Sequence, residues 1–279
     1  MRRPFFSIVI VNYNYGRFLP DALNSLYTQS FKDFEIIVVD GGSTDGSVAY
    51  LKTQQNRLAW WVSEPDRGQS DAFNKGFAQA KGQYGLWLNA DDLLLPHALE
   101  SAHREIIATD ALWVSSDYVR VTEDLRVISC HRGLAQQPPL LREWGAPVSV
   151  CGPSSFFALQ ALWQRVGGFE VNLRYAMDID LWLKWMRLGI YPHRYHHYSW
   201  AFRMHEGSKT AYRFSKDYFN PRARAIKTEV AELSLKLGYH LDPVLRGLAG
   251  VYKIQDGSAW SAWRDTQRYR GKNLGELPT

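Results

Sequence analysis

The stretch FSIVIVN, Phe6 to Asn12, decides the fold of this chain because it begins an alternation of short apolar runs with amphipathic stretches. The later runs are FEIIVVD (Phe34 to Asp40), LAWWVS (Leu58 to Ser63) and YGLWL (Tyr84 to Leu88), and between them lie the stretches Leu19 to Thr28, Ser47 to Gln54 and Gln69 to Ala80. Strands that alternate with helices are typical of βαβ units. The runs are almost continuously apolar, as expected where helices cover both faces of a sheet. The pattern predicts an α/β fold with a mostly parallel, doubly wound, Rossmann-like sheet.

The pattern changes in the second half of the chain. The expected elements there are a helix from Pro96 to about Ala108, strands at Leu112 to Val121 and Val127 to His131, a polar loop at Gln136 to Pro139, a helix ended by Gly167 and Gly168, a helix from Asp178 to Gly189, strands near Arg194 to His205, and a mostly helical tail from Ser215. We therefore expect a domain over residues 1–212, in two halves at 1–110 and 111–212, and an extension over residues 213–279.

Composition narrows the class of protein. A hydrophobic content of 46% with 22% charged residues is ordinary for a globular protein and argues against disorder. The two cysteines, Cys130 and Cys151, provide neither a disulfide framework nor a metal-binding pair, which suits a reducing compartment. No apolar run approaches the roughly 20 residues that span a bilayer, so we expect a cytoplasmic protein. From Arg213 onward 12 Lys and Arg stand against 7 Asp and Glu, so the extension carries the whole net charge of +5.

Polar residues follow three of the predicted strands. The first strand is followed by NYNYG, the second ends in DGGSTDGS, and the fourth ends in NADD. Asp40 taken alone is a turn residue before two glycines. Three polar strand ends together favour a ligand, because open α/β sheets bind ligands outside the carboxyl ends of their strands. A dinucleotide is disfavoured, since NYNYGRF lacks the G-x-G-x-x-G pattern, and no Walker loop is present.

Asp91 and Asp92 offer another way to neutralise bound phosphates. Mg²⁺ and Mn²⁺ take carboxylate oxygens together with phosphate oxygens of a substrate. The alternative is a helix start before Pro96, where acidic residues are favoured by the helix dipole. Their position at the end of a buried strand favours the metal.

A series of motifs in this order resembles a family 2 glycosyltransferase of the GT-A fold, of the bacterial polysaccharide and cell-envelope type. The resemblance runs from Phe6 to Thr210 through SIVIVNYNYGRFLPDALNSL, EIIVVDGGSTDGS, EPDRGQSDAFNKGFAQAKGQY, LNADD, VGGFE, MDIDLWLKW and RMHEGSKT. It implies transfer of a sugar from a UDP, GDP or dTDP type donor to a saccharide or lipid-linked acceptor, with Mn²⁺ or Mg²⁺ as cofactor. Residues 1–110 would then bind the nucleotide and residues 111–212 would face the acceptor. No nucleic-acid partner is expected.

The resemblance also implies roles for single residues. NADD takes the place of the family's DXD-type motif but begins with Asn89, which can bond a ribose hydroxyl and brings no charge. Metal binding therefore falls mainly on Asp91, with Asp92 on metal or diphosphate. The remaining donor-site residues would be Asp40 on the base, Asn12 and Tyr13 on the nucleoside, Arg67 and Asp71 on the ribose or diphosphate, His205 on the metal or diphosphate, and Lys209 on the diphosphate. For Asp71 a helix start is equally open, and Lys75 is better explained as its i, i+4 partner.

Transfer also needs a base that takes the proton of the acceptor hydroxyl. The stretch MDIDLWLKW offers Asp178 and Asp180, which cannot share one face of a helix. Asp180 precedes Lys184 by four residues, which predicts an ordinary surface ion pair. Asp178 matches the base position of the family, although a capping role is compatible with that position. A base opposite the diphosphate would invert the anomeric configuration, and Ser154 and Ser155 could face the acceptor.

The basic extension has two open interpretations. SAWSAWRDTQRYRGK places Trp260 and Trp263 beside arginines, as in helices that lie on anionic membranes. That would put the protein at the inner face of the membrane, whereas packing on the catalytic domain or on a homodimer partner is simpler.

Two rival functions also stay open: a sugar-1-phosphate nucleotidyltransferase, which NYNYGRF fits poorly, and a non-catalytic nucleotide-sugar-binding scaffold.

Overall fold

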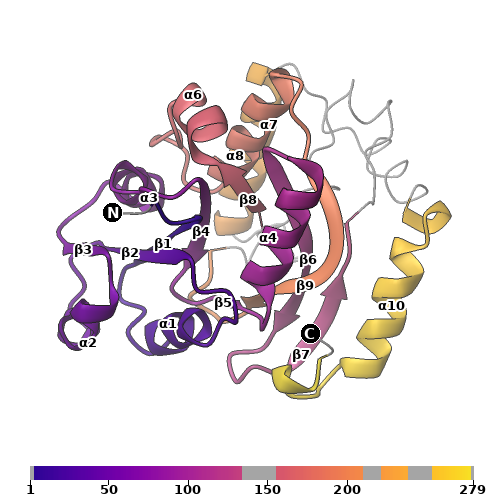
Figure 1. The fold of residues 1–279 in the computed structure, drawn as a ribbon, viewed down its shortest axis with the longest axis horizontal. Helices are drawn as coiled ribbons and strands as arrows, with labels where there is room; N and C mark the ends of the chain where they lie inside the picture. The colour runs from indigo at the N-terminus through magenta and orange to yellow at the C-terminus, as the bar shows by residue number, and fades with distance from the viewer. Residues whose placement is uncertain (1–2, 134–154, 210–220, 238–252, 278–279) are drawn as a thin grey trace.

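A single mixed sheet forms the centre of the molecule (Figure 1). The structure, a computed structural model, describes residues 3–133, 155–209, 221–237 and 253–277. Within these ranges the sheet has nine strands in the order β3-β2-β1-β4-β8-β6-β9-β5, and β7 pairs with β6. The predicted loop at Gln136 to Pro139, Cys151 and Ser154 lie outside the described residues.

The first half of the sheet is parallel, as predicted. It contains β1 (Phe6–Asn12), β2 (Phe34–Asp40), β3 (Trp60–Ser63) and β4 (Tyr84–Asn89). Helices α1 (Leu19–Tyr27) and α2 (Ser47–Gln54) lie on one side of these strands, and α3 (Gln69–Ala78) lies on the other (Figure 1). Every residue of β1 is buried, which explains its continuous apolar run.

The register of the parallel strands aligns their polar ends. Asn12 pairs with Asp40 across β1 and β2, and Val11 pairs with Asn89 across β1 and β4. The residues that follow these strands therefore meet at one edge of the sheet. This arrangement confirms the expectation that the three polar strand ends lie together.

The second half of the sheet is mixed. It contains β5 (Leu93–Leu94), β6 (Trp113–Val121), β7 (Val127–His131), β8 (Ser155–Ala158) and β9 (His193–Arg203). β6 runs parallel to β9 and antiparallel to β7 and β8. The helices of this half are α4 (Ala98–Thr109), α6 (Gln164–Val166), which follows a π-helical turn at Leu159–Trp163, and α7 (Met177–Arg187). Gly167 and Gly168 end α6 with φ angles of +79° and +78°, as their place in the sequence predicts.

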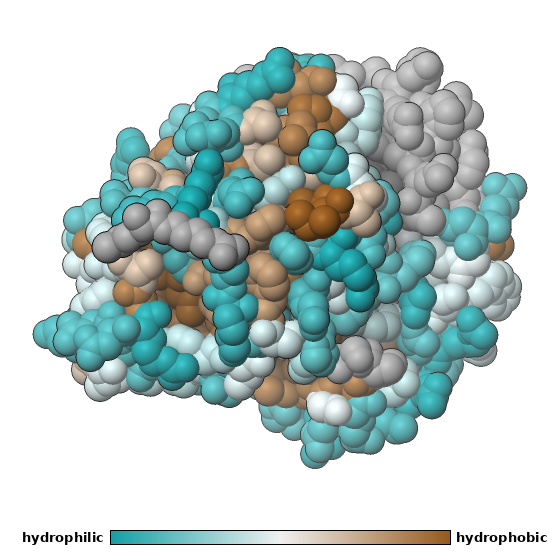
Figure 2. Space-filling model, viewed as in Figure 1, coloured by the Kyte–Doolittle hydropathy of each residue, from teal (hydrophilic) through white to brown (hydrophobic). Residues whose placement is uncertain are grey.

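The extension is helical where the structure describes it, and it packs on the domain. α8 (Pro221–Leu237) places Leu233 in the main hydrophobic core, which also contains the strands β1, β2 and β4. α10 (Ser258–Tyr269) and the turn Leu274–Glu276 lie against β6, β7 and β9, where Tyr269 and Leu277 enter a second, smaller core. No helix of the described ranges is long and apolar enough to cross a membrane. Hydrophilic residues dominate the face seen in Figure 2.

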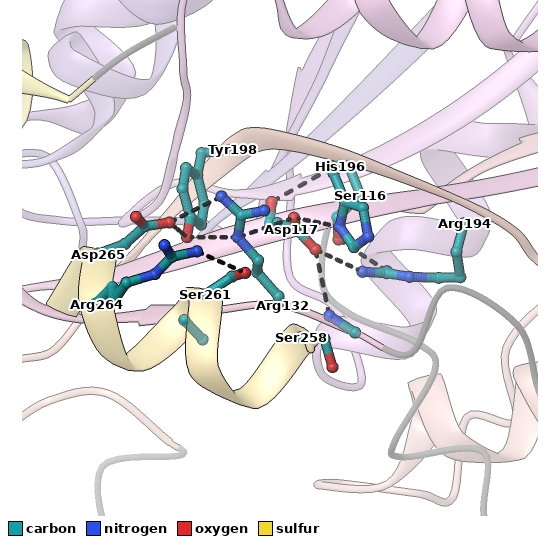
Figure 3. Close-up of polar contacts among 12 residues, drawn as sticks. Ser116, Asp117, Arg132, Arg194, His196, Tyr198, Ser258, Ser261, Arg264 and Asp265 are labelled. Atoms are coloured by element: carbon teal, nitrogen blue, oxygen red, sulfur yellow. Dashed lines mark hydrogen bonds and ion pairs between the residues drawn. The ribbon is translucent and has the colours of Figure 1, made fainter. Parts of the chain in front are cut away.

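Polar contacts fasten α10 to the sheet (Figure 3). Asp265 accepts hydrogen bonds from the Tyr198 hydroxyl at 2.6 Å and from Arg132 Nη2 at 2.8 Å. Beside them the buried Asp117 binds Arg194 Nη2 at 2.9 Å. Charge-assisted bonds of this kind fix orientation as well as adding energy. One side of α10 is therefore held against β9, and its other side faces outward.

Candidate active site

A cavity of about 470 Å³ opens at the carboxyl ends of β1 and β4, beside the first turn of α7. Six of the residues predicted from the sequence line it: Asn12, Tyr13, Asn89, Asp91, Asp178 and Lys209. They come from four separate regions of the chain, and parallel register together with the packing of α7 brings them together. The cavity lies where an α/β sheet is expected to bind its ligand.

Asp91 and His205 form a buried pair at this cavity. His205 Nε2 lies 3.0 Å from Asp91 Oδ2, and His205 Nδ1 has no hydrogen-bond partner within the described ranges. The ring of Tyr15 packs edge-on against His205, and its hydroxyl donates to the carbonyl of Gly207. Burial raises the pKa of Tyr15, and the charges of Asp91 and Asp92 raise it further. Tyr15 therefore stays neutral and holds the loop after β9 over the pair.

Asp92 has different surroundings from Asp91. Its Oδ1 accepts a bond from the Arg203 backbone N–H at 2.9 Å, and its Oδ2 accepts one from Asn89 Nδ2 at 3.2 Å. Burial raises the pKa of Asp92, and the charge of Asp91 raises it further. Asp92 does not line the cavity, and it connects the end of β4 to the end of β9. Its contact with metal or diphosphate stays a prediction.

Asp40 is buried, and both of its oxygens are occupied. They accept bonds from the Ser43 and Ser63 hydroxyls, from Asn12 Nδ2 and from two backbone N–H groups of the following loop. Burial alone would raise the pKa of Asp40, but these donors outweigh it and hold the pKa below its usual value. The carboxylate thus fixes the loop beside β1, and a contact with the base stays a prediction.

The structure supports the helix-start interpretation of Asp71. Its carboxylate accepts bonds from Arg67 Nη2 at 2.9 Å and from the Arg67 backbone N–H at 3.1 Å. Neither residue lines the cavity. Lys75 pairs with Glu64 at 2.9 Å and lies 3.8 Å from Asp71, so the predicted i, i+4 pair is the longer of its two ion pairs.

A chain of hydrogen bonds crosses the cavity wall through Gln69, which the sequence reasoning did not single out. Gln69 Nε2 donates to Asn89 Oδ1 at 2.6 Å, and Gln69 Oε1 accepts from Lys209 Nζ at 3.1 Å. Gln69 is the first residue of α3, and a polar residue at the start of this helix was the signal from which its role could have been predicted. These hydrogen bonds fix the orientation of the Asn89 amide, whose oxygen points toward Gln69.

The two acids of α7 point to different sides of the helix, as their spacing requires. Asp178 is half-buried in the first turn, lines the cavity, and accepts a bond from the Ile179 N–H at 2.8 Å. Ala176, not Asp178, is the N-cap residue. Asp180 pairs with Lys184 at 2.7 Å. That pair was predicted to be a surface pair, and this was wrong: Asp180 is only 4% exposed because its side of α7 faces the core.

One of the two predicted acceptor serines, Ser155, does not lie at the cavity. Ser155 is fully buried in β8, where it pairs with Ser115 of β6, and it does not line the cavity. Ser154 falls outside the described residues. The cavity is also lined by residues that the sequence reasoning missed: Tyr118, Arg120, Arg174, Tyr175 and Trp182. They come from β6, from α7 and from the loop before α7, and the packing of these elements beside the first half of the sheet leaves no local signal.

The residues present fit a divalent cation that shares its ligands with a substrate. In the described part of the chain, no three His, Cys, Asp or Glu side chains form a group able to hold a metal by themselves. Mg²⁺ and Mn²⁺ need only one or two protein ligands when phosphates supply the others. Two ligands at right angles, each about 2.1 Å from such an ion, lie about 3 Å apart. Asp91 Oδ2 and His205 Nε2 have that separation.

Comparison of the sequence with protein families decides the class of this site. The family model described as glycosyl transferase family 2 matches residues 7–162, which is more than half of the chain. The chain belongs to glycosyltransferase family 2. The match covers β1 to β4, the NADD motif and most of the strands that follow.

Curated relatives of this glycosyltransferase share its sequence over part of their length. An uncharacterized glycosyltransferase of Nostoc sp. is 42% identical over 97 residues, which are 34% of this chain and 30% of that protein. One from Mycobacterium tuberculosis is 30% identical over 184 residues, 65% of this chain and 68% of that protein. The chondroitin synthase of Pasteurella multocida is 28% identical over 195 residues, 69% of this chain and 20% of the synthase. The chain thus spans 30% of the Nostoc relative and 20% of the synthase.

Solved structures establish the GT-A fold of this glycosyltransferase. Residues 1–349 of TarS from S. aureus, in complex with UDP-GlcNAc, match with a TM-score of 0.61 at 18% identity, covering 88% of this chain and 70% of that fragment. The mannosyltransferase PcManGT from Pyrobaculum calidifontis, in complex with GDP-Man and Mn²⁺, matches with a TM-score of 0.57 at 19% identity, covering 96% and 85%. At these identities the likeness concerns the fold.

Proposed function

We propose that this glycosyltransferase moves a sugar from a nucleotide-diphosphate donor to a hydroxyl of a saccharide or lipid-linked acceptor, with inversion and with a divalent cation. One observation carries the proposal: a single cavity is lined by the ends of β1 and β4, by Asp91, which pairs with the buried His205 behind it, and by Asp178. Binding of the donor and removal of the acceptor's proton need these groups in one cavity. The family match favours sugar transfer over a nucleotidyltransferase.

The donor would lie along the polar strand ends. Asn12 and Tyr13 line the cavity beside β1 and would face the nucleoside, while Asn89 would bond the ribose. Lys209 lines the same cavity and would meet the diphosphate. Mn²⁺ or Mg²⁺, held by Asp91 and His205, would act as a Lewis acid on the diphosphate leaving group. The loop after β2 would be fixed by Asp40, and the loop before α3 by Arg67 and Asp71, so these three residues would support the donor site indirectly.

The chemical step would be a displacement at the anomeric carbon. Asp178 would take the proton of the acceptor hydroxyl while the acceptor oxygen bonds to the anomeric carbon. The bond between that carbon and the diphosphate oxygen would break, and the nucleoside diphosphate would leave with the electron pair. Attack from the face opposite the diphosphate gives inversion, and a carboxylate within reach of the hydroxyl is the base that such a step needs.

Isothermal titration of UDP, GDP, dTDP and CDP, each with and without Mn²⁺, tests the donor site. We expect one diphosphate to bind, and only with metal, because the buried acids at the end of β4 repel an uncompensated diphosphate. Metal-independent binding would instead assign the diphosphate to basic groups that line the cavity, such as Lys209. Absence of binding for all four would overturn the proposed function.

We further propose that α10 contacts an anionic membrane surface at the inner face of the membrane. Trp260 and Trp263 are 59% and 56% exposed, and their rings lie edge to face with centroids 6.4 Å apart. Arg264 and Arg268 are exposed on the same helix. Tryptophans beside arginines suit the boundary between lipid headgroups and acyl chains. A membrane position would suit a lipid-linked acceptor.

Sedimentation with vesicles tests this contact. We expect binding to vesicles that contain phosphatidylglycerol and not to neutral phosphatidylcholine vesicles. Replacing both Trp260 and Trp263 by Ala should weaken binding about tenfold, because two apolar surfaces are lost. Ile107→Ala on α4 is the control, since Ile107 is equally exposed at 65%. Equal binding by the double variant would contradict the proposal, and a dimer that the double variant abolishes would assign the same surface to a homodimer.

A further inference from the structure

Glu229, in helix α8 of the extension, binds the loop that leads into α7. Its Oε2 accepts a bond from the Arg174 backbone N–H at 3.0 Å, and its Oε1 accepts bonds from the N–H groups of Tyr175 and Ala176, both at 2.7 Å. Three successive backbone groups are thus held by one carboxylate. The sequence gives no sign of these contacts, because 53 to 55 residues separate the partners.

The three N–H groups belong to the N-cap residue of α7, Ala176, and to the two residues before it. The first N–H groups of a helix lack partners within it, and they are usually satisfied by a side chain at the N-cap. The N-cap of α7 is Ala176, which makes no side-chain hydrogen bond. Glu229 does not replace that acceptor; it holds the three residues that lead into α7, and its negative charge is favourable near that end of the helix.

Packing holds α8 in the place from which Glu229 reaches this loop. Ile226 and Leu233 are 3% and 5% exposed, and Leu233 belongs to the main core. Glu229 lies three residues after Ile226 and four before Leu233, so the three share one face of α8. A half-buried carboxylate fixed in this way makes strong charge-assisted bonds to the loop.

The loop and the first turn of α7 form one wall of the cavity. Arg174, Tyr175, Met177 and Asp178 all line it. We propose that Glu229 is a positioning residue that sets the place of Asp178 for proton transfer, so that the extension completes the active site. The catalytic part of this inference rests on the proposed function. A displacement of about 1 Å at a reacting group can lower a rate by about 100-fold.

Glu229→Ala tests the inference against Glu232→Ala, a substitution at an exposed position of the same helix. We expect Glu229→Ala to lower kcat at saturating donor by about 10- to 100-fold, with the Kd of the nucleoside diphosphate unchanged within about twofold. Glu229→Gln keeps one acceptor oxygen and should restore part of kcat. Glu232→Ala should keep kcat. A kcat of Glu229→Ala within twofold of the parent would overturn the positioning role.

Hydrogen exchange of the backbone amides provides a readout that does not depend on turnover. In Glu229→Ala the amides of Arg174, Tyr175 and Ala176 should exchange at least about tenfold faster, while amides of β1 and β4 keep their protection. Unchanged exchange at the loop would overturn the inference. If Glu229→Ala exchanges faster at the loop but the parent enzyme shows no turnover, the contact of Glu229 with the loop is upheld and the proposed function is rejected. The two failures are thus distinguishable.

Discussion

Asp178→Asn is expected to lower kcat by about 10²- to 10⁴-fold, the range that a positioned general base contributes. Asparagine has nearly the same shape, and its side-chain oxygen can still accept the bond from the Ile179 N–H. It cannot take a proton from the acceptor hydroxyl. The nucleoside diphosphate should bind with unchanged Kd, because its proposed contacts lie at the ends of β1 and β4. Steady-state turnover and titration calorimetry on the same preparation measure the two quantities.

Asp180→Asn is the matched control for this prediction. Asp180 lies in the same turn of α7 but is buried and pairs with Lys184. Its replacement removes an ion pair from the core side of the helix, so the melting temperature should fall while the folded enzyme keeps kcat within about twofold. Turnover that survives in Asp178→Asn would exclude Asp178 as the base. A parent protein without turnover on any acceptor would favour the scaffold reading.

The strands of the first half were predictable because their signal is local. The predicted bounds Phe6 to Asn12 and Phe34 to Asp40 match β1 and β2 at both ends, since a continuous β-branched run bounded by polar residues leaves little choice. β5 has only two residues, too few for any period to show. β8 joins β4 to β6, and such a pairing depends on contacts between distant parts of the chain.

Some residues of the site were likewise predictable from local sequence, whereas the roles of others depend on contacts with distant parts of the chain. The residues that end a strand or begin a helix, such as Asn12, Asp91 and Asp178, line the cavity because the secondary structure itself places them there. What each acid does depends on partners far away in the sequence. Asp92 is bonded to Arg203, 111 residues later, and no pattern within NADD distinguishes it from Asp91. The resemblance assigned metal mainly to Asp91, but the sequence could not show that Asp92 is bonded to the end of β9 and does not line the cavity.

Asp91→Asn should remove the effect of metal on donor binding. Asp91 is the acid of NADD that lines the cavity and lies next to His205, so it is the carboxylate able to meet a cation and a diphosphate together. Loss of groups that only support metal ligands costs about 10- to 100-fold, and loss of a ligand itself should cost at least about 100-fold. The Kd of the diphosphate in Mn²⁺ should rise by that factor, and EDTA should then have little further effect on binding.

Asp92→Asn distinguishes this explanation from a general loss of charge. Burial and the charge of Asp91 raise the pKa of Asp92, so a neutral side chain at this position is less disruptive than at Asp91. The asparagine oxygen can still accept the bond from the Arg203 N–H. Metal-dependent binding should therefore persist in Asp92→Asn, within about tenfold of the parent. Equal losses in the two variants would make both acids ligands, whereas metal dependence that survives in Asp91→Asn would exclude Asp91 as the ligand that links the cation to the donor.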